Sequence, residues 1–421
     1  MDLILLAVPF FFVLIAVELV ADRVRGQHNF TLADSINSLS TGALSTSTGL
    51  LTKGVGLVTY ALVFEHLALL QLPAQAGWVW LLAFVLYDFC YYWLHRLGHE
   101  RNVLWAAHSV HHQSEEYNLT TALRQTSSGF IFSWLFYLPL ALLGVPPLLY
   151  QFWVHTRHIP KLGWLEWVLI TPSNHRVHHA QNPAYLDRNY GGVFILWDRL
   201  FGTFKEEDPA EPVVFGVTTP LASWNPLWAN LQFYAQLWHD ARRAGSLWDK
   251  LRIWFMPTGW RPADVAARYP QAKQDLALFR KFEIALGRGQ QAYVAAQFVV
   301  YVALGSYLMD VADRVSAAAL VLGWSLMAFG LFVLGALLEN RPWSARLELA
   351  RLCLNAPALY LAGALGLAVV APLAWLLLVA YSLLSLWGLG LARRPALRAQ
   401  STEAPAQPQQ AAQRHQAAKH P

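Results

Sequence analysis

The sequence contains little cysteine and little charge. Only two cysteines, Cys90 and Cys353, occur among 421 residues. Both lie in apolar segments far apart, which argues against a disulfide framework and a cysteine-based zinc site. Charged residues make up 14% of the chain and hydrophobic residues 56%, and the mean hydropathy is +0.32. This composition is too apolar for an ordinary soluble protein. It predicts an integral, multi-pass, all-α membrane protein.

The chain also lacks a strong excess of charge of one sign. It has 31 Lys and Arg against 26 Asp and Glu, and the basic residues cluster beside hydrophobic runs. Such clustering indicates membrane topology and does not indicate nucleic-acid binding. With nine spans, the positive-inside rule collects the basic loops on one side of the membrane. It therefore predicts that every histidine-rich segment faces the cytoplasm.

Long hydrophobic runs are numerous and predict about seven to nine transmembrane helices. The first run, at 3–20, has neither a basic region before it nor a small-residue cleavage site after it, so we expect an uncleaved span. Pro146 and Pro147 separate two apolar runs that either both cross the membrane or form a re-entrant pair. The runs lie at 3–20, 43–64, 78–94, 128–145 and 148–170, with up to four more in 292–392.

These runs divide the chain into four parts. Residues 1–75 and 291–394 are expected to be transmembrane helices. Residues 76–290 hold the histidine-rich segments and much of the charge. Residues 395–421 form a tail rich in Gln, Ala and Pro, for which we expect disorder.

Histidine is concentrated at helical spacings in three clusters, at 95–99, 108–112 and 175–179. The eight residues are His95, His99, His108, His111, His112, His175, His178 and His179. Side chains three or four positions apart share one face of a helix, so each cluster directs its imidazoles toward one point. Eight imidazoles are too many for one ion but suit two ions with four or five ligands each. Nitrogen ligands fit iron or zinc better than calcium or magnesium.

Two further histidines lie in the apolar run at 148–170. A polar side chain is costly against lipid, so an intramembrane histidine indicates a functional site. We expect His155 to reach the metals as a ninth ligand, whereas the role of His158 stays open. Isolated histidines such as His28, His66 and His239 are better explained as surface or interface residues.

Carboxylates and other polar residues near the clusters are candidates for supporting roles. Asp88 precedes His95 by two helical turns, and we expect its carboxylate to accept the second ring N–H of a ligand histidine. A helix-packing contact is the alternative. The further catalytic candidates are Glu100, Glu116 and Asn118. For Glu100 or Glu116 considered individually, an ordinary surface position is an equally good explanation.

The three histidine strings carry a family resemblance. HRLGH, HSVHH and HRVHH resemble the fatty acid hydroxylase and sterol desaturase superfamily of membrane di-iron enzymes. Within it, the strings EEYNLTTALRQ and NYGGVFILWDRLFGTF are similar to the alkylglycerol monooxygenase branch, over residues 87–220. The resemblance implies that residues 76–290 form a catalytic domain with two iron ions. It also implies that O₂ and a tetrahydropterin serve to hydroxylate the carbon next to an ether oxygen, which yields a fatty aldehyde and glycerol.

With this resemblance, polar residues after the second cluster become candidates for binding the pterin. They are Glu115, Glu116, Asn118 and Arg124. Without it, they are better explained as braces of the histidine helix. Two other functions remain open: a fatty acid or sterol hydroxylase or desaturase of the same superfamily, and a membrane zinc-binding protein without enzymatic activity. Redox-inactive zinc cannot activate O₂, so metal content separates the last from the others.

Overall fold

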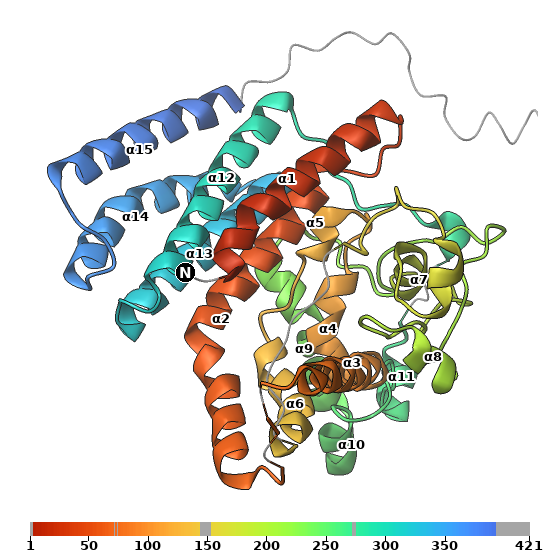
Figure 1. The fold of residues 1–421 in the computed structure, drawn as a ribbon. Helices are drawn as coiled ribbons and strands as arrows, with labels where there is room; N and C mark the ends of the chain where they lie inside the picture. Colours follow the sequence, from red (N-terminus) through yellow and green to blue (C-terminus); the bar gives the residue numbers. More distant parts are fainter. Residues whose placement is uncertain (1–2, 71, 74, 144–152, 272–274, 393–421) are drawn as a thin grey trace, which may run out of the picture.

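The computed structural model describes residues 3–70, 72–73, 75–143, 153–271 and 275–392. These residues form helices and loops, and no β-strand occurs among them (Figure 1), which confirms the predicted all-α class. The tail at 395–421, for which disorder was predicted, lies outside the described residues. The helices are α1 (Leu3–Val24), α2 (Leu32–Leu67), α3 (Gly77–Glu100), α4 (Asn102–His112), α5 (Leu119–Ala122), α6 (Ser133–Leu142), α7 (Pro172–His178), α8 (Leu196–Leu200), α9 (Pro226–Arg243), α10 (Leu247–Arg252), α11 (Ala263–Arg268), α12 (Arg288–Val311), α13 (Ala317–Leu338), α14 (Ser344–Ala364) and α15 (Pro372–Ala392), with 3-10 turns at Gly129–Ile131, Gly163–Trp167 and Leu276–Leu278.

Several of these helices suit a membrane. Among the described residues, α3, α12, α13 and α15 are long and apolar enough to cross one. The two parts of α2, Leu32–Thr52 and Gly54–Leu67, are bent by 47° and make a fifth candidate if they form one span. These helices support an integral membrane protein. The predicted count of seven to nine spans is not reached within the described part of the chain.

The difference arises partly in the two apolar runs around Pro146 and Pro147. Within the first run, α6 has ten residues, a length of about 15 Å, which is half of the hydrocarbon thickness of a bilayer. From residue 153 onward, the second run contains turns and the 3-10 segment Gly163–Trp167 instead of a long helix. Pro160 and Gly163, the latter at φ +66°, interrupt helical geometry there.

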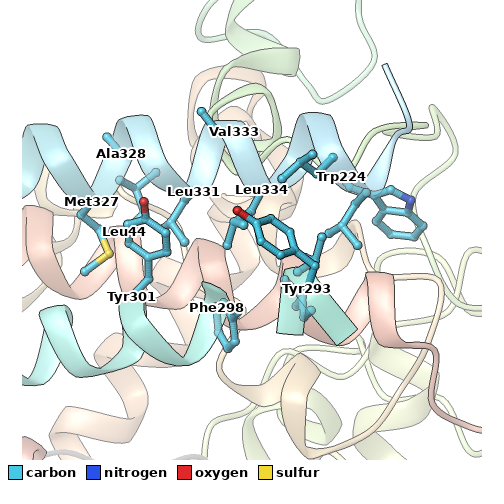
Figure 2. Packing of buried hydrophobic residues seen from close by; sticks show 14 of the residues in the cluster. Leu44, Trp224, Tyr293, Phe298, Tyr301, Met327, Ala328, Leu331, Val333 and Leu334 are labelled. Carbon is cyan, nitrogen blue, oxygen red and sulfur yellow. The ribbon is translucent and has the colours of Figure 1, made fainter. Parts of the chain in front are cut away.

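The C-terminal helices share a packed core with α2. Figure 2 shows Leu331 and Leu334 of α13 facing the aromatic rings of α12, with Leu44 of α2 beside them. Tyr301 of α12 packs directly against Gly330 of α13. Only glycine leaves room there, because a Cβ at position 330 would overlap the tyrosine ring. Close packing of this kind requires a glycine on one of the two helices.

The other side of α2 packs against the segment that follows the second histidine cluster. A Cβ at Gly42 would lie 2.1 Å from the carbonyl oxygen of Leu123. Asn37, also in α2, donates to the carbonyl of Trp224 at 2.7 Å and accepts from the guanidinium of Arg124. Thus α2 connects the C-terminal core to the loop beside the histidines.

We predict that Gly42→Ala lowers the free energy of unfolding by about 1–3 kcal/mol, because the new methyl group overlaps a backbone atom that cannot rotate away. Gly49→Ala in the same helix is the matched control, since nothing lies within 4 Å of a Cβ there. That control is expected to gain up to about 1 kcal/mol from helix propensity. Thermal unfolding in detergent measures both, and equal midpoints would contradict the prediction.

Candidate metal centre

Nine buried or nearly buried histidines gather into two neighbouring groups. The first group is His95, His99, His108, His112 and His178, and the second is His111, His155, His175 and His179. In each group, the candidate ligand nitrogens lie within 4.8 Å of one another. The groups adjoin, with 4.3 Å between the ring centroids of His112 and His179. The structure therefore brings together all eight clustered histidines and His155.

Each H-x-x-H-H string supplies both groups. In α4, His108 and His112 are four residues apart and enter the first group, while His111 points to the second. At α7 the roles reverse: His175 and His179 enter the second group, and His178 enters the first. The side chains of adjacent helical residues point in directions about 100° apart, so one turn of helix can supply ligands to two neighbouring sites.

Backbone carbonyls orient at least three of the rings. The Nδ1 atom of His95 lies 2.7 Å from the carbonyl of Tyr190. That of His111 lies 2.8 Å from the carbonyl of Arg124, and that of His178 lies 3.0 Å from the carbonyl of Arg188. A carbonyl only accepts hydrogen bonds, so Nδ1 carries the proton in each ring. The Nε2 lone pair is then directed into the group.

The converging Nε2 atoms fit a pair of cations. The separations are 3.1 Å for His95–His108, 3.0 Å for His108–His112, 3.1 Å for His111–His155, 3.0 Å for His155–His175 and 3.1 Å for His175–His179. Two nitrogens bound to one metal at about 2.1 Å and at right angles lie about 3.0 Å apart. Nε2 of His99 and of His178 is buried without a hydrogen-bond partner among the described residues. The donor set suits two ions.

Burial keeps these imidazoles neutral. It lowers the pKa of His111 to about 4. Burial, with neighbouring imidazoles as the next cause, also lowers the pKa well below its ordinary value for His108, His112, His175, His178 and His179. Neutral imidazole is the form that binds metals, so the rings need not lose protons at neutral pH.

The structure corrects the role predicted for Asp88. Its carboxylate accepts from the backbone N–H of Val193 at 2.6 Å, of Phe194 at 3.0 Å, and from the Trp197 indole at 2.9 Å. No hydrogen bond to a histidine is formed, because two helical turns separate Asp88 from His95 by about 10 Å. Asp88 instead attaches the segment before α8 to α3.

Two other predicted catalytic residues also have partners away from the histidines. Glu100 forms an ion pair with Arg96 at 2.8 Å, one turn earlier on α3. Asn118 caps α5 by accepting from the N–H of Thr120, and it donates to the carbonyl of Asn29. Their geometry corresponds to structural roles.

The acidic pair before Tyr117 is engaged by a distant segment. Glu115 accepts from the backbone N–H of Phe282 at 2.6 Å, and Glu116 binds the ammonium of Lys281 at 2.7 Å. Burial raises the pKa of both carboxyl groups. These contacts fasten the segment before α12 beside the second cluster.

Arg124 is a buried brace of the second cluster. Its guanidinium donates to the carbonyl of Val110 at 2.6 Å, to the amide of Gln113 at 3.0 Å, and to Asn37. Its own carbonyl is the acceptor for His111. Burial lowers the pKa of Arg124 to about 10, so the side chain remains charged at neutral pH. The bracing explanation fits this residue better than direct contact with a cofactor.

Sequence reasoning did not find Asp198. Its carboxylate accepts from the N–H groups of Tyr190 and Gly191, both at 2.7 Å, and from the hydroxyl of Thr203 at 2.6 Å. Asp198 thereby holds the backbone of Tyr190, whose carbonyl orients His95. Burial raises the pKa of Asp198 to about 6. Its position in the string NYGGVFILWDRLFGTF was the only available signal.

His158 belongs to neither histidine group. Its ring lies 3.2 Å from the guanidinium of Arg25 and 3.8 Å from the carboxylate of Asp22. Both partners are at the end of α1. This residue thus joins the N-terminal helix to the loop that carries His155.

A cavity of about 270 Å³ opens beside both groups. His95 and His108 of the first group line it together with His111 and His155 of the second. The rest of its wall is mainly apolar, from Leu94 of α3, Leu104 and Ala107 of α4, and Phe132 before α6. An alkyl chain can therefore approach the converging imidazoles without water around it.

Comparison with known proteins agrees with this arrangement. The family model described as fatty acid hydroxylase matches residues 80–203, which include both histidine groups. No solved structure matches the chain. The fold and the histidine groups are therefore those of a histidine-rich membrane oxidoreductase.

More extensive similarity covers most of the chain. It is 38% identical over 362 residues to alkylglycerol monooxygenase of Danio rerio, with 82% of this chain and 79% of that protein covered. The human protein of that name is 36% identical, with 84% and 81% covered, and that of Xenopus tropicalis is 35% identical, with 82% and 79% covered. The chain belongs to the alkylglycerol monooxygenase family. This confirms the predicted superfamily, branch and enzyme class.

We predict that Arg124→Met lowers both the thermal midpoint and the metal content, because it removes the bonds that hold His111 in place. Loss of an orienting group commonly costs about 10-fold or more in metal affinity. Arg101→Met, at an exposed position, is the matched control. Normal metal content with weakened pterin binding would instead support a direct cofactor contact. Elemental analysis and dialysis with a pterin distinguish the two outcomes.

Proposed function

We propose that this protein is a membrane monooxygenase that cleaves the ether bond of alkylglycerols. The observation that carries the proposal is an apolar cavity lined by imidazoles from both histidine groups. One O₂, the lipid C–H bond and a two-electron reductant give a hydroxylated lipid, water and the oxidised reductant. Hydroxylation of the carbon next to the ether oxygen creates a hemiacetal, which separates into a fatty aldehyde and glycerol.

The two groups would hold one iron ion each. Five imidazoles would be available to the first ion and four to the second. When bound, iron supplies the redox chemistry that O₂ activation needs. The protein holds the rings rigidly. Backbone carbonyls orient the imidazoles, the Asp198 carboxylate holds the backbone at Tyr190, and the Arg124 side chain is anchored to the carbonyl of Val110 in α4. The family similarity favours iron over zinc.

The chain positions the lipid through the shape of the cavity. Leu94 and Phe132 border it next to α3 and α6, so an alkyl chain can enter from the bilayer. Exclusion of water protects reactive species from side reactions. No carboxylate borders this cavity among the described residues.

We propose a tetrahydropterin as the reductant, on the basis of the family similarity. The residues first considered for its binding, Glu115, Glu116, Asn118 and Arg124, are all engaged inside the protein. Arg124 braces the histidine helix, Asn118 caps α5, and the two glutamates hold the segment before α12, so we do not assign the pterin to them.

We predict the activity directly. Purified, iron-loaded protein should convert an alkylglycerol to a fatty aldehyde with tetrahydropterin, because the cavity admits an alkyl chain to both groups. Aldehyde formation is compared with that supported by a ferredoxin or cytochrome reductant, and free fatty acids and sterols are the alternative substrates. Turnover of those substrates alone would assign the chain to the fatty acid or sterol hydroxylases.

For the metal, we predict about two iron ions per chain in anaerobically purified protein, as the two histidine groups require. His112→Ala and His179→Ala remove one ligand from the first and second group respectively, and each should reduce metal affinity about 10-fold or more. His239→Ala, at an exposed position, is the control. Stable zinc without oxygenase activity after iron loading would support the non-enzymatic alternative.

For the orientation, we propose that the histidine groups face the cytoplasm, as the positive-inside rule indicates. In a background with Cys90 and Cys353 replaced by serine, Ala210→Cys should escape an impermeant thiol reagent in intact cells and react in inverted vesicles. Gln75→Cys, before α3, should behave in the opposite way. Both positions are exposed. Labelling of Ala210→Cys from outside would reverse the orientation.

A further inference from the structure

A second, larger cavity lies between α4 and α9. It measures about 680 Å³ and is bordered by α9, the start of α4, and the segments around residues 181–186, 218–219 and 258–271. Its lining is more polar than that of the lipid cavity and includes Gln181, Gln236 and Asp240. No role has so far been assigned to it.

One wall of this cavity covers the first histidine group. Trp105 lines the cavity, and its ring centroid lies 5.0 Å from that of His99 and 5.7 Å from that of His112. Phe233 of α9 lies 5.8 Å from Trp105, with the two rings at 70°. The Trp105 indole therefore lies between Phe233 and the first histidine group as a direct aromatic contact of both.

The same wall contains a buried acceptor that has no partner. Gln181 is 3% exposed, and its Oε1 forms no hydrogen bond with the described residues. Its Nε2 donates to the carbonyl of Phe215 at 2.9 Å, which fixes which end of the amide is the acceptor. An unpaired buried acceptor costs free energy, and a ligand N–H would recover it.

The two cavities border different faces of α4. Leu104, Ala107, His108 and His111 face the lipid cavity, whereas Trp105 faces the polar one. The lipid and a polar reductant can therefore be bound at the same time, each next to the histidine groups. The linings differ in character: that of the first cavity is mainly apolar beside the imidazoles, and that of the second adds Gln181, Gln236 and Asp240.

We propose that the cavity at Gln181 and Phe233 binds the tetrahydropterin. Its pyrimidine edge, which carries an amino group and a ring N–H, donates to Oε1 of Gln181, and its ring plane packs on Phe233. Asp240 lines the same cavity and is held by Arg261 at 2.6 and 2.9 Å. This inference rests on the proposed function, because it assigns the reductant of that reaction to a place.

Binding is measured by equilibrium dialysis of 7,8-dihydrobiopterin, a form that cannot reduce the metals, against the full-length, iron-loaded protein. We expect Gln181→Leu and Phe233→Leu each to raise the Kd about 10-fold or more. Phe233→Tyr, which retains the aromatic face, should stay within about twofold of the unmodified protein. Iron content and the KM for the alkylglycerol should remain unchanged in all three.

The reciprocal variant is Phe132→Ala, which enlarges the lipid cavity. It should alter the KM for the alkylglycerol and leave the pterin Kd unchanged. Unchanged Kd values for Gln181→Leu and Phe233→Leu, in a protein that oxidises alkylglycerol with tetrahydropterin, would overturn this inference alone. A protein that neither binds the pterin nor turns over with it, but is active with a protein reductant, would overturn the proposed reductant.

Discussion

The convergence of nine imidazoles in a buried space is the constraint on which the rest of the structure depends. Neutral rings whose lone pairs face one another at about 3 Å repel, and water cannot relieve that repulsion because the groups are buried. Such an arrangement is stable only when cations occupy the space between the nitrogens, or when the surrounding protein holds the rings in place. Much of the polar chemistry around the site serves the second purpose.

The bracing is built in layers. Backbone carbonyls of Tyr190, Arg124 and Arg188 hold the rings. Buried Asp198 and Arg124 side chains then hold those backbone segments. Carbonyls have a fixed position once the backbone is fixed, and they specify one histidine tautomer. Asn37 and Gly42 of α2 contact Arg124 and Leu123, and α2 also packs in the C-terminal core (Figure 1).

The centre separates its two proposed ligands by the geometry of a single helix. Because adjacent residues of α4 diverge by about 100°, the imidazoles and small apolar residues form the wall of one cavity, and Trp105 forms the wall of another. In the proposed function, a lipid from the bilayer and a water-soluble reductant would have separate routes to the same histidine groups. An enzyme that takes substrates from two phases needs such a division, since neither ligand is soluble in the environment of the other.

The sequence by itself determined the composition of the centre. Helical spacing made the eight clustered histidines recognisable as candidate ligands, and the cost of a polar residue in an apolar run indicated His155. The all-α class followed from hydrophobic patterning. Only the tertiary structure decided how the histidines divide into five and four, because each H-x-x-H-H string serves both groups. It also decided that Asp88, Glu100 and Asn118 have structural partners and that a run as apolar as 148–170 does not form a long helix in its described part. Spacing along one helix is a local property, whereas the partner of a carboxylate depends on distant segments. Trp197 is 109 residues from Asp88, and Lys281 is 165 residues from Glu116.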